Sequence, residues 1–347
     1  MHRVSNHAVG AAHIGPGSEP RDEFAHIVGR SAGLRQAVQK ARLLAEVGSP
    51  VLVLGETGVG KEVFTRAIHR SGRHAYGPFV ALNCGSLPRD LLASELFGYV
   101  EGAFTGARRS GMAGKIEAAH GGTLFLDEIA EMPLDLQPYL LRVLEGGEVY
   151  RLGCNKPHTV EFRLIAACNR DLRSEVTAGR FRMDLFYRVS VTSLYIPPLR
   201  ERREDIAELV EHFSGAVVAH QGVQPKAFAP EVLGALAAYS WPGNLRELRN
   251  VVEAMILLTE DDVVGLAALP SDLGAATAGP PDTAGRGGPD AGLERVQCNA
   301  IGAAIRMHRG NLTEVARDLR IAKSTLYLKM KKYALESLVH EARRGVR

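Results

Sequence analysis

The chain has few of the residues that build disulfide frameworks or structural metal sites. Its 347 residues include only four cysteines, which are Cys84, Cys154, Cys168 and Cys298. None belongs to a Cys-x-x-Cys pair, and none has histidines nearby at zinc-ligand spacing, which argues against a disulfide scaffold and against a zinc site. The four cysteines are typical of reduced thiols, and we expect a cytoplasmic protein.

Long apolar runs are also missing. No stretch approaches the ~18 apolar residues that a membrane-spanning helix requires, so no membrane association is expected. The first twenty residues contain Gly, Pro, His and charges of both signs but no apolar segment typical of a signal peptide. About twenty-two residues precede the first regular pattern. We therefore expect no receiver or ligand-sensing domain in this chain.

Charge is unevenly distributed along the chain. The formal net charge is only +3, but residues 293–347 carry 12 Lys/Arg against 5 Asp/Glu, and the remaining residues carry 30 against 34. A basic segment attached to a mildly acidic body is expected if the tail binds a polyanion such as nucleic acid. A solvated basic tail without a fold of its own is the alternative.

Apolar strand patterns alternate with amphipathic helical patterns up to Pro197 and Pro198. This alternation predicts an α/β fold with a mainly parallel sheet. The expected strands are Pro50–Leu54, Phe79–Asn83, Thr123–Leu126 and Arg163–Ala167. After the prolines, apolar residues at three- and four-residue spacing predict an α-helical lid with helices at Glu204–His220, Pro230–Tyr239 and Asn244–Leu258.

A glycine-rich loop follows the first expected strand and leads into a helix that continues to Arg70. This is the context of a phosphate-binding loop, because backbone N–H groups and a helix N-terminus bind phosphates while a lysine reaches the β- and γ-phosphates. A flexible turn with an incidental lysine is the alternative. The expected nucleotide-binding residues are Gly55, Glu56, Thr57, Gly58, Val59, Gly60, Lys61 and Glu62. Glu62 stands where Ser or Thr would offer a hydroxyl to Mg²⁺, which leaves metal binding to an acidic residue elsewhere.

The acidic pair Asp127 and Glu128 is the second half of this candidate site. It follows the apolar strand between Gly122 and Asp127. The pair is therefore expected at the carboxyl edge of the sheet, where open α/β folds bind ligands. We expect Asp127 to hold Mg²⁺ through water and Glu128 to polarise the water that attacks ATP. Taken alone, such a pair is often only a helix cap.

A loop between these two motifs reads Gly102-Ala-Phe-Thr-Gly-Ala107, so glycines flank Phe104 and Thr105. The pattern predicts a mobile loop whose exposed aromatic needs a partner, although a Phe folded back onto the core would have the same spacing. Together with the loop Gly55–Glu62, this hexapeptide resembles the central domain of bacterial enhancer-binding activators of sigma-54 RNA polymerase, a branch of the AAA+ ATPases. The resemblance covers roughly residues 24–260.

The resemblance implies a role for the hexapeptide and for further residues. It assigns sigma-54 contact to Gly102, Ala103, Phe104, Thr105, Gly106 and Ala107, and places a second pore loop at Met132–Asp135. Asn83 resembles the asparagine that restrains the catalytic glutamate. Asn169 and Arg246 resemble the first and second nucleotide sensors. From its own chemistry, Asn244 follows a Trp-Pro-Gly turn into a helix and is expected to be the N-cap, a role compatible with the nucleotide role of Arg246. Cys168 stands where the family usually has Thr.

Arg182 and Arg188 resemble arginines that enter the neighbouring subunit's site, where such a residue stabilises charge on the transferred phosphoryl group. Without the family match, a surface salt bridge would explain either arginine equally well. Because these arginines leave a monomer with an incomplete site, the resemblance implies a homo-oligomer, from a dimer to a ring that is usually a hexamer.

The basic tail has the pattern of a helix-turn-helix between Gly310 and Tyr333. Ala316 is small where two helices would cross, and Leu319 and Ile321 bracket the turn. The segment is similar to the Fis-type module that ends many of these activators, although a helical dimerisation bundle is the alternative. The implied DNA contacts are Lys323, Ser324, Thr325, Tyr327, Lys329, Lys331 and Lys332.

We therefore predict a sigma-54-dependent activator that binds enhancer DNA and uses ATP and Mg²⁺ to remodel the RNA polymerase holoenzyme, with control by a regulatory protein in trans as one possibility. The alternatives are a DNA-bound AAA+ regulator uncoupled from sigma-54, and a DNA helicase or loader. The predicted domains are a leader (1–22), the AAA+ core (23–197), the helical lid (198–263), a linker (264–292) and the Fis-type domain (293–347).

Overall fold

The computed structural model describes residues 22–103 and 110–270, together with residues 273, 305, 308, 311, 312, 314 and 315. The chain divides into two compact units, Met1–Gly279 and Pro280–Arg347, and the five-stranded sheet and the helices around it belong to the first. Several predicted site residues lie outside the described residues. They are Phe104, Thr105, Gly106 and Ala107 of the hexapeptide, and all seven predicted DNA contacts from Lys323 to Lys332.

A five-stranded parallel sheet forms the centre of the unit, with strand order β2-β5-β8-β1-β9. Four of these strands lie where the sequence predicts them, and the fifth, β9, was not predicted. The strands are β1 (Val51–Leu54), β2 (Phe79–Asn83), β5 (Thr123–Asp127), β8 (Arg163–Cys168) and β9 (Thr192–Tyr195). The register pairs Asn83 with Asp127 and Leu54 with Cys168, so the carboxyl ends of the inner strands meet at one edge.

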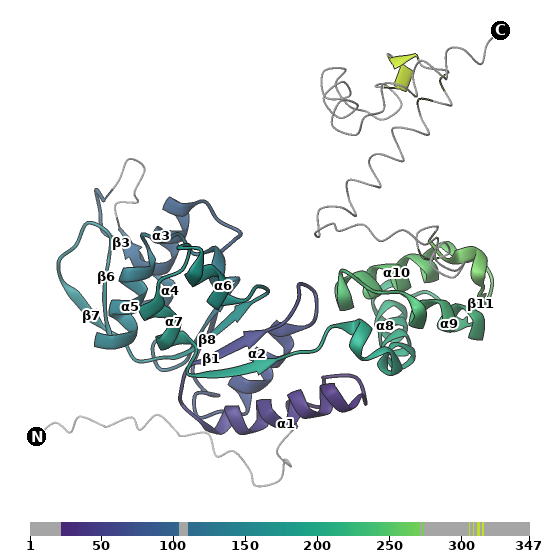
Figure 1. Ribbon diagram of the computed structural model, residues 1–347, viewed down its shortest axis with the longest axis horizontal. Helices are drawn as coiled ribbons and strands as arrows, with labels where there is room; N and C mark the ends of the chain where they lie inside the picture. Colours follow the sequence, from purple (N-terminus) through teal and green to yellow (C-terminus); the bar gives the residue numbers. More distant parts are fainter. Residues whose placement is uncertain are drawn as a thin grey trace, which may run out of the picture. The chain divides into compact units, whose positions relative to one another are not determined.

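Both faces of the sheet are covered by helices, as its near-continuous apolar strands require. Successive residues alternate between two cores: Leu124 and Leu126 pack in one, and Phe125 packs in the other. Figure 1 shows α1 and α2 apart from the cluster of α3 to α7. The helices are α1 (Ala32–Glu46), α2 (Lys61–Arg70), α3 (Arg89–Phe97), α4 (Lys115–Ala118), α5 (Gln137–Gly146), α6 (Leu172–Thr177) and α7 (Met183–Val189).

Two short antiparallel hairpins extend from this core. One pairs β3 (Gly98–Tyr99) with β4 (Met112–Ala113) and carries the hexapeptide, and the other pairs β6 (Glu148–Tyr150) with β7 (Pro157–Thr159). The β6–β7 hairpin is hydrogen-bonded to the β3–β4 hairpin: Val100 N donates to Leu152 O at 3.1 Å, and Leu152 N donates to Gly98 O at 2.9 Å. The described start of the hexapeptide, Gly102 and Ala103, is therefore anchored through residues just beyond β6.

The lid has its own core, which includes the fully buried Trp241 and side chains from three helices. These helices are α8 (Ile206–Gln221), α9 (Pro230–Ala238) and α10 (Asn244–Leu258). Short elements complete the fold: η1 (Ile129–Glu131), η2 (Leu199–Glu201), η3 (Arg203–Asp205), η4 (Leu266–Ala268), β10 (Ala227–Phe228) and β11 (Val263–Val264). Within the described residues, no helix has the length and apolar character to cross a membrane.

Candidate functional site

The glycine-rich loop runs from the end of β1 to the first turn of α2, as its sequence predicts. Gly60 directly precedes the helix with a left-handed backbone (φ 103°), and Gly58 also has positive φ (78°). A Cβ on Gly58 would lie 2.3 Å from the carbonyl oxygen of Gly243. Only glycine fits there, because the loop passes directly against the start of the lid helix α10.

Lys61, the first residue of α2, lies inside this loop. Its side chain is almost fully buried, and its Nζ donates to the carbonyl oxygens of Gly55 (2.8 Å) and Glu56 (3.0 Å). Burial lowers the pKa of Lys61, while the charges of Asp127 and Glu128 act in the opposite direction. A cation held beside two carboxylates at a helix N-terminus is suited to bind phosphate.

Asp127 and Glu128 lie at the end of β5, where the sequence predicts them. The carboxylate of Asp127 accepts a hydrogen bond from Glu128 N at 3.0 Å. Burial raises the pKa of Asp127, and the charge of Lys61 partly offsets this effect. Glu128 adopts a left-handed backbone (φ 52°, ψ 46°), which is uncommon for a residue with a side chain and often marks a functional site.

Asn83, at the end of β2, lies beside this pair but contacts a different acid from the one expected. Its Nδ2 donates to Asp127 Oδ2 at 3.4 Å, and its Oδ1 accepts from Gly85 N at 2.8 Å. Among the described residues, no hydrogen bond joins Asn83 to Glu128. The glutamate side chain is nevertheless close, because a Cβ on Gly85 would lie 2.6 Å from Glu128 Oε2.

The end of β8 contributes Cys168 and Asn169 to the same edge. Gly55 N donates to the carbonyl oxygen of Cys168 at 3.2 Å, and Asn169 Nδ2 donates to Thr57 Oγ1 at 3.1 Å. Asn169 is thus in direct contact with the glycine-rich loop. The Cys168 thiol is fully buried, and burial raises its pKa, so it has little thiolate character.

Glu62 is placed differently from the other predicted loop residues. Its carboxylate pairs with Arg66 one turn along α2 at 2.7 Å, and its side chain is 57% exposed. The acid therefore forms an ordinary i,i+4 helix pair.

The lid contacts the glycine-rich loop partly through residues that the sequence does not single out, namely Arg200, Arg202 and Leu245. Arg200 forms a two-pronged ion pair with Glu56 (2.7 and 2.8 Å), and Arg202 donates to Val59 O at 3.1 Å. Leu245 N donates to Gly58 O at 3.0 Å, and the Cβ of Arg246 lies 3.2 Å from the position of a Cβ on Gly58. Arg246 therefore lies beside the loop, and its sensor role stays a prediction.

The N-cap prediction for Asn244 is wrong. Gly243 is the N-cap of α10, and Asn244 is the first helical residue, with φ 51°. Its Nδ2 donates to Glu56 Oε2 and to Thr57 O, both at 3.1 Å, while its Oδ1 accepts from Leu199 N at 2.8 Å. The side chain therefore bridges the lid and the loop instead of capping its own helix.

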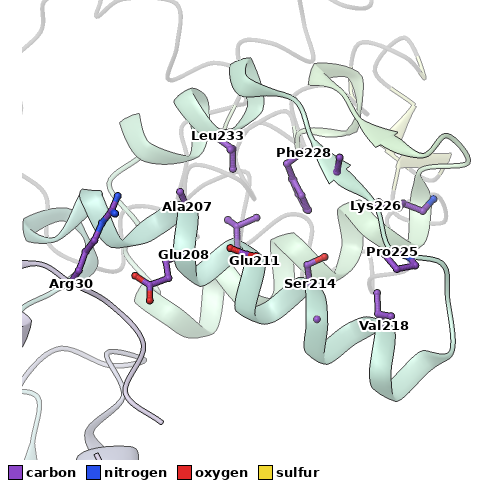
Figure 2. A pocket seen from close by; sticks show the side chains of 13 residues that line it. Arg30, Ala207, Glu208, Glu211, Ser214, Val218, Pro225, Lys226, Phe228 and Leu233 are labelled. Atoms are coloured by element: carbon purple, nitrogen blue, oxygen red, sulfur yellow. The ribbon is translucent and has the colours of Figure 1, made fainter. Parts of the chain in front are cut away.

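A small cavity of about 120 Å³ adjoins the loop. Ile27 and Val28 line it from the N-terminal segment, Gly60 and Phe64 from the loop and α2, and Leu245 from α10. A larger cavity of about 690 Å³ lies in the lid between α8, α9 and the segment around Phe228 (Figure 2). None of the residues lining the larger cavity is a predicted site residue, so cavity size does not locate the candidate site here.

Arg182 and Arg188 lie on or beside α7 and have partners within the chain. Arg182 pairs with Asp184 at 2.6 Å, and Arg188 Nη2 donates to Leu144 O at 2.6 Å. Within the described part of the chain, no hydrogen bond or ion pair joins either arginine to Lys61 or to the acidic pair. The predicted second pore loop begins at Met132, which is buried, and ends at Asp135, which pairs with Arg89 of α3.

Comparison with known families covers most of the chain. Residues 27–195 match the sigma-54 interaction domain, residues 200–285 the AAA+ ATPase lid domain, and residues 292–333 the bacterial regulatory protein, Fis family.

Individual proteins are similar over nearly the whole chain. The transcriptional regulatory protein ZraR of Escherichia coli is 41% identical over 88% of this chain and 68% of its own length. A Geobacillus stearothermophilus protein named limonene hydroxylase is 44% identical over 92% of this chain and 58% of its own length. The structure of NtrX from Brucella abortus in complex with ATP is 34% identical, with a TM-score of 0.68, over 88% of this chain and 69% of that one. The chain spans between 49% and 69% of the length of such curated relatives.

Proposed function

The chain belongs to the family of sigma-54-dependent bacterial transcription regulators, with an AAA+ ATPase domain and a Fis-type DNA-binding domain, and from this premise we propose that it hydrolyses ATP to open the sigma-54 promoter complex. One observation carries the ATPase part: Lys61, Asp127 and Glu128 meet at the carboxyl edge of the parallel sheet, with mutual electrostatic effects. The Brucella abortus NtrX structures in complex with ATP and with ADP support the choice of nucleotide.

The proposed roles follow from the position of each group. The glycine-rich loop and Lys61 bind the β- and γ-phosphates, and the small apolar cavity beside Gly60 accepts the base. Glu128 orients and polarises the attacking water, while Asn169 and Arg246 contact the γ-phosphate from β8 and from the lid. The arginine that completes the site, Arg182 or Arg188, comes from a neighbouring subunit of a homo-oligomeric ring.

The residues at this edge fit a bound Mg²⁺ ion. Its preferred ligands are hard oxygen atoms, and Asp127 presents a half-buried carboxylate at the end of β5 beside the glycine-rich loop. Asp127 would hold the ion, largely through water. When bound, Mg²⁺ supplies Lewis-acid stabilisation of the phosphoryl oxygens.

The coupling to transcription rests on the hexapeptide Gly102–Ala107 and on the basic tail. We propose that the Fis-type domain binds enhancer DNA, and that changes at the γ-phosphate move the hexapeptide against sigma-54 within the RNA polymerase holoenzyme. The anchoring of its hairpin to Leu152 supports this proposal, because a loop held at its base transmits movement of the core better than a free one.

The deciding experiment compares wild type with Thr105→Ala in open-complex formation on a sigma-54 promoter with ATP. We expect Thr105→Ala to keep its ATPase activity and to lose both open-complex formation and binding of sigma-54 in a transition-state-analogue complex. Ser110→Ala is the matched control, because Ser110 follows the hexapeptide and is exposed, and it should behave as wild type.

If Thr105→Ala still opens the promoter, the role of the hexapeptide is wrong. If wild type hydrolyses ATP but opens no sigma-54 promoter, the regulator is uncoupled from sigma-54, which is the second function that the sequence allows.

A further inference from the structure

Four consecutive residues of the glycine-rich loop are bound by the lid. The carboxylate of Glu56 accepts hydrogen bonds from Arg200 and Asn244. The carbonyl oxygens of the next three residues each accept one hydrogen bond. The donors to those carbonyls are Asn244 for Thr57 (3.1 Å), Leu245 for Gly58 (3.0 Å) and Arg202 for Val59 (3.1 Å). The lid therefore contacts the loop as a continuous strip.

The lid binds the carbonyl side of the glycine-rich loop. In a trans peptide the N–H group lies opposite the carbonyl. Binding the carbonyls of Thr57 and Val59 from the lid thus leaves the N–H groups of Gly58 and Gly60 on the other side, where a phosphate needs donors. Docking of the lid and the phosphate-binding shape of the loop are parts of one arrangement.

Backbone strain is concentrated at the same contact. Three non-glycine residues in the described ranges have positive φ, and two of them, Trp241 and Asn244, lie in the single turn that leads into α10. Such backbone conformations are unfavourable for residues with a side chain and persist where the surroundings hold them. Here the holding contacts include the fully buried Trp241, whose Nε1 donates to Leu236 O at 2.8 Å, and the bonds of Asn244 to the loop.

We propose that Arg200 and Asn244, acting through Glu56, are positioning residues that keep the glycine-rich loop in its nucleotide-binding shape only while the lid is docked. Nucleotide affinity and lid position are then linked, so that anything that displaces the lid weakens nucleotide binding, and nucleotide binding favours the docked lid. This inference rests on the proposed function, because it takes the loop to be the phosphate site.

The ion pair is too exposed to serve mainly as a stabiliser of the fold. The side chains of Arg200 and Glu56 are 40% and 39% exposed, and exposed pairs contribute little to global stability. Arg200 nevertheless holds the pKa of Glu56 below its usual value through the paired hydrogen bonds. Loss of the pair should therefore appear in nucleotide affinity and not in the melting temperature.

The test uses the full chain with Arg200→Gln and Asn244→Gly, and Arg203→Gln as the control. Glycine at position 244 keeps the left-handed backbone while removing the side-chain bonds, and Arg203 is an exposed arginine of the same segment. We measure the affinity for a slowly hydrolysed ATP analogue, KM and kcat for ATP, and the fluorescence of Trp241, the only tryptophan in the chain.

We expect Arg200→Gln and Asn244→Gly each to weaken analogue binding about tenfold, within the range of typical coupling effects. KM should rise more than kcat falls, and the analogue-induced change in Trp241 fluorescence should shrink. In a double-mutant cycle, Glu56→Gln combined with Arg200→Gln should lose no more affinity than Glu56→Gln alone. Arg203→Gln should match wild type.

Analogue affinity within twofold of wild type in both Arg200→Gln and Asn244→Gly would overturn the proposal. The proposed ATP site would still stand in that case, provided that Lys61→Ala abolishes analogue binding. If wild type itself binds no analogue, the proposed function fails together with the proposed link between the lid and nucleotide affinity. If the losses of analogue affinity in Glu56→Gln and Arg200→Gln add up in the double variant, the direct link between Glu56 and Arg200 is also overturned.

Discussion

Glu128 combines an unusual backbone with a role that demands accurate placement. Its φ of 52° turns the chain sharply after β5, and its carboxylate lies over Gly85, which has no side chain to displace it. The neighbouring Asp127 has a pKa raised by burial, and its carboxylate accepts hydrogen bonds from Asn83 and from Glu128 N. The two carboxylates therefore have different neighbours and are suited to different tasks.

Glu128→Gln should abolish ATP hydrolysis while leaving ATP bound. The amide has nearly the same shape as the carboxylate but cannot accept a proton from water, so turnover should fall by at least about a hundredfold. Analogue binding and steady-state hydrolysis measure the two properties separately. Glu131→Gln, which removes the partner of Arg170 one turn further on, is the control. Turnover near wild type in Glu128→Gln would refute the assigned role.

The sequence predicts some of these residues and misses others for a physical reason. Lys61 and Asp127 are recognisable because a strand, a loop or an apolar run next to them in sequence fixes their position. Arg200 and Asn244 reach Glu56 across 144 and 188 residues, and no local pattern encodes that approach. Asn244 even has a local signal for the wrong role, since an asparagine before a helix usually caps it.

At the level of elements, three of the four strands that the sequence predicts (β1, β5 and β8) are inner strands that are almost fully buried, and the fourth, β2, is a partly buried edge strand with a continuous apolar run. β9 was missed because Thr192 and Ser193 interrupt its apolar character, and its place beside β1 depends on tertiary pairing. The hairpin of β6 and β7 was missed because each strand has only three residues. This hairpin nonetheless holds the base of the hexapeptide, and an ion pair between Arg151 and Glu117 of α4 fixes it to the core (both 2.7 Å).

Glu117→Gln should destabilise the protein at neutral pH but much less in acid. The hydrogen bonds from Arg151 hold the pKa of Glu117 below its ordinary value of 4.5, so the ion pair contributes its stability above pH 4.5 and loses it as pH falls through the lowered folded-state pKa. Because the Glu117 side chain is only 13% exposed, the loss in free energy of unfolding at pH 7 should be about 2 kcal/mol.

Urea unfolding of wild type and variant at pH 7, 5 and 4 measures this difference. Glu148→Gln is the control, because Glu148 lies on the same hairpin and is exposed. A difference between wild type and Glu117→Gln that stays constant between pH 7 and pH 4 would contradict the ion-pair explanation.

At the level of the whole molecule, α7 presents charged and apolar groups to the outside of the described chain. Met183 and Tyr187 are 55% and 67% exposed on the same short helix, whose ends carry Arg182 and Arg188. Exposed apolar residues next to arginines are typical of surfaces that bind another protein. In the proposed ring, this surface of α7 would pack against a neighbouring subunit. Arg182 or Arg188 would then enter the nucleotide site of that neighbour.

Mixing two inactive variants should restore activity if the site is shared between subunits. A ring subunit with Arg182→Ala keeps its own Lys61 and Glu128, and a Glu128→Gln neighbour supplies the missing arginine. In random rings made from equal amounts, about one site in four is then complete, so the mixture should recover up to about a quarter of wild-type turnover.

The same experiment with Arg188→Ala shows which of the two arginines crosses the interface. Lys61→Ala mixed with Glu128→Gln is the matched control, because both changes damage the same half of the site and no arrangement of subunits repairs it. Recovery in neither arginine mixture would mean that each subunit completes its own site.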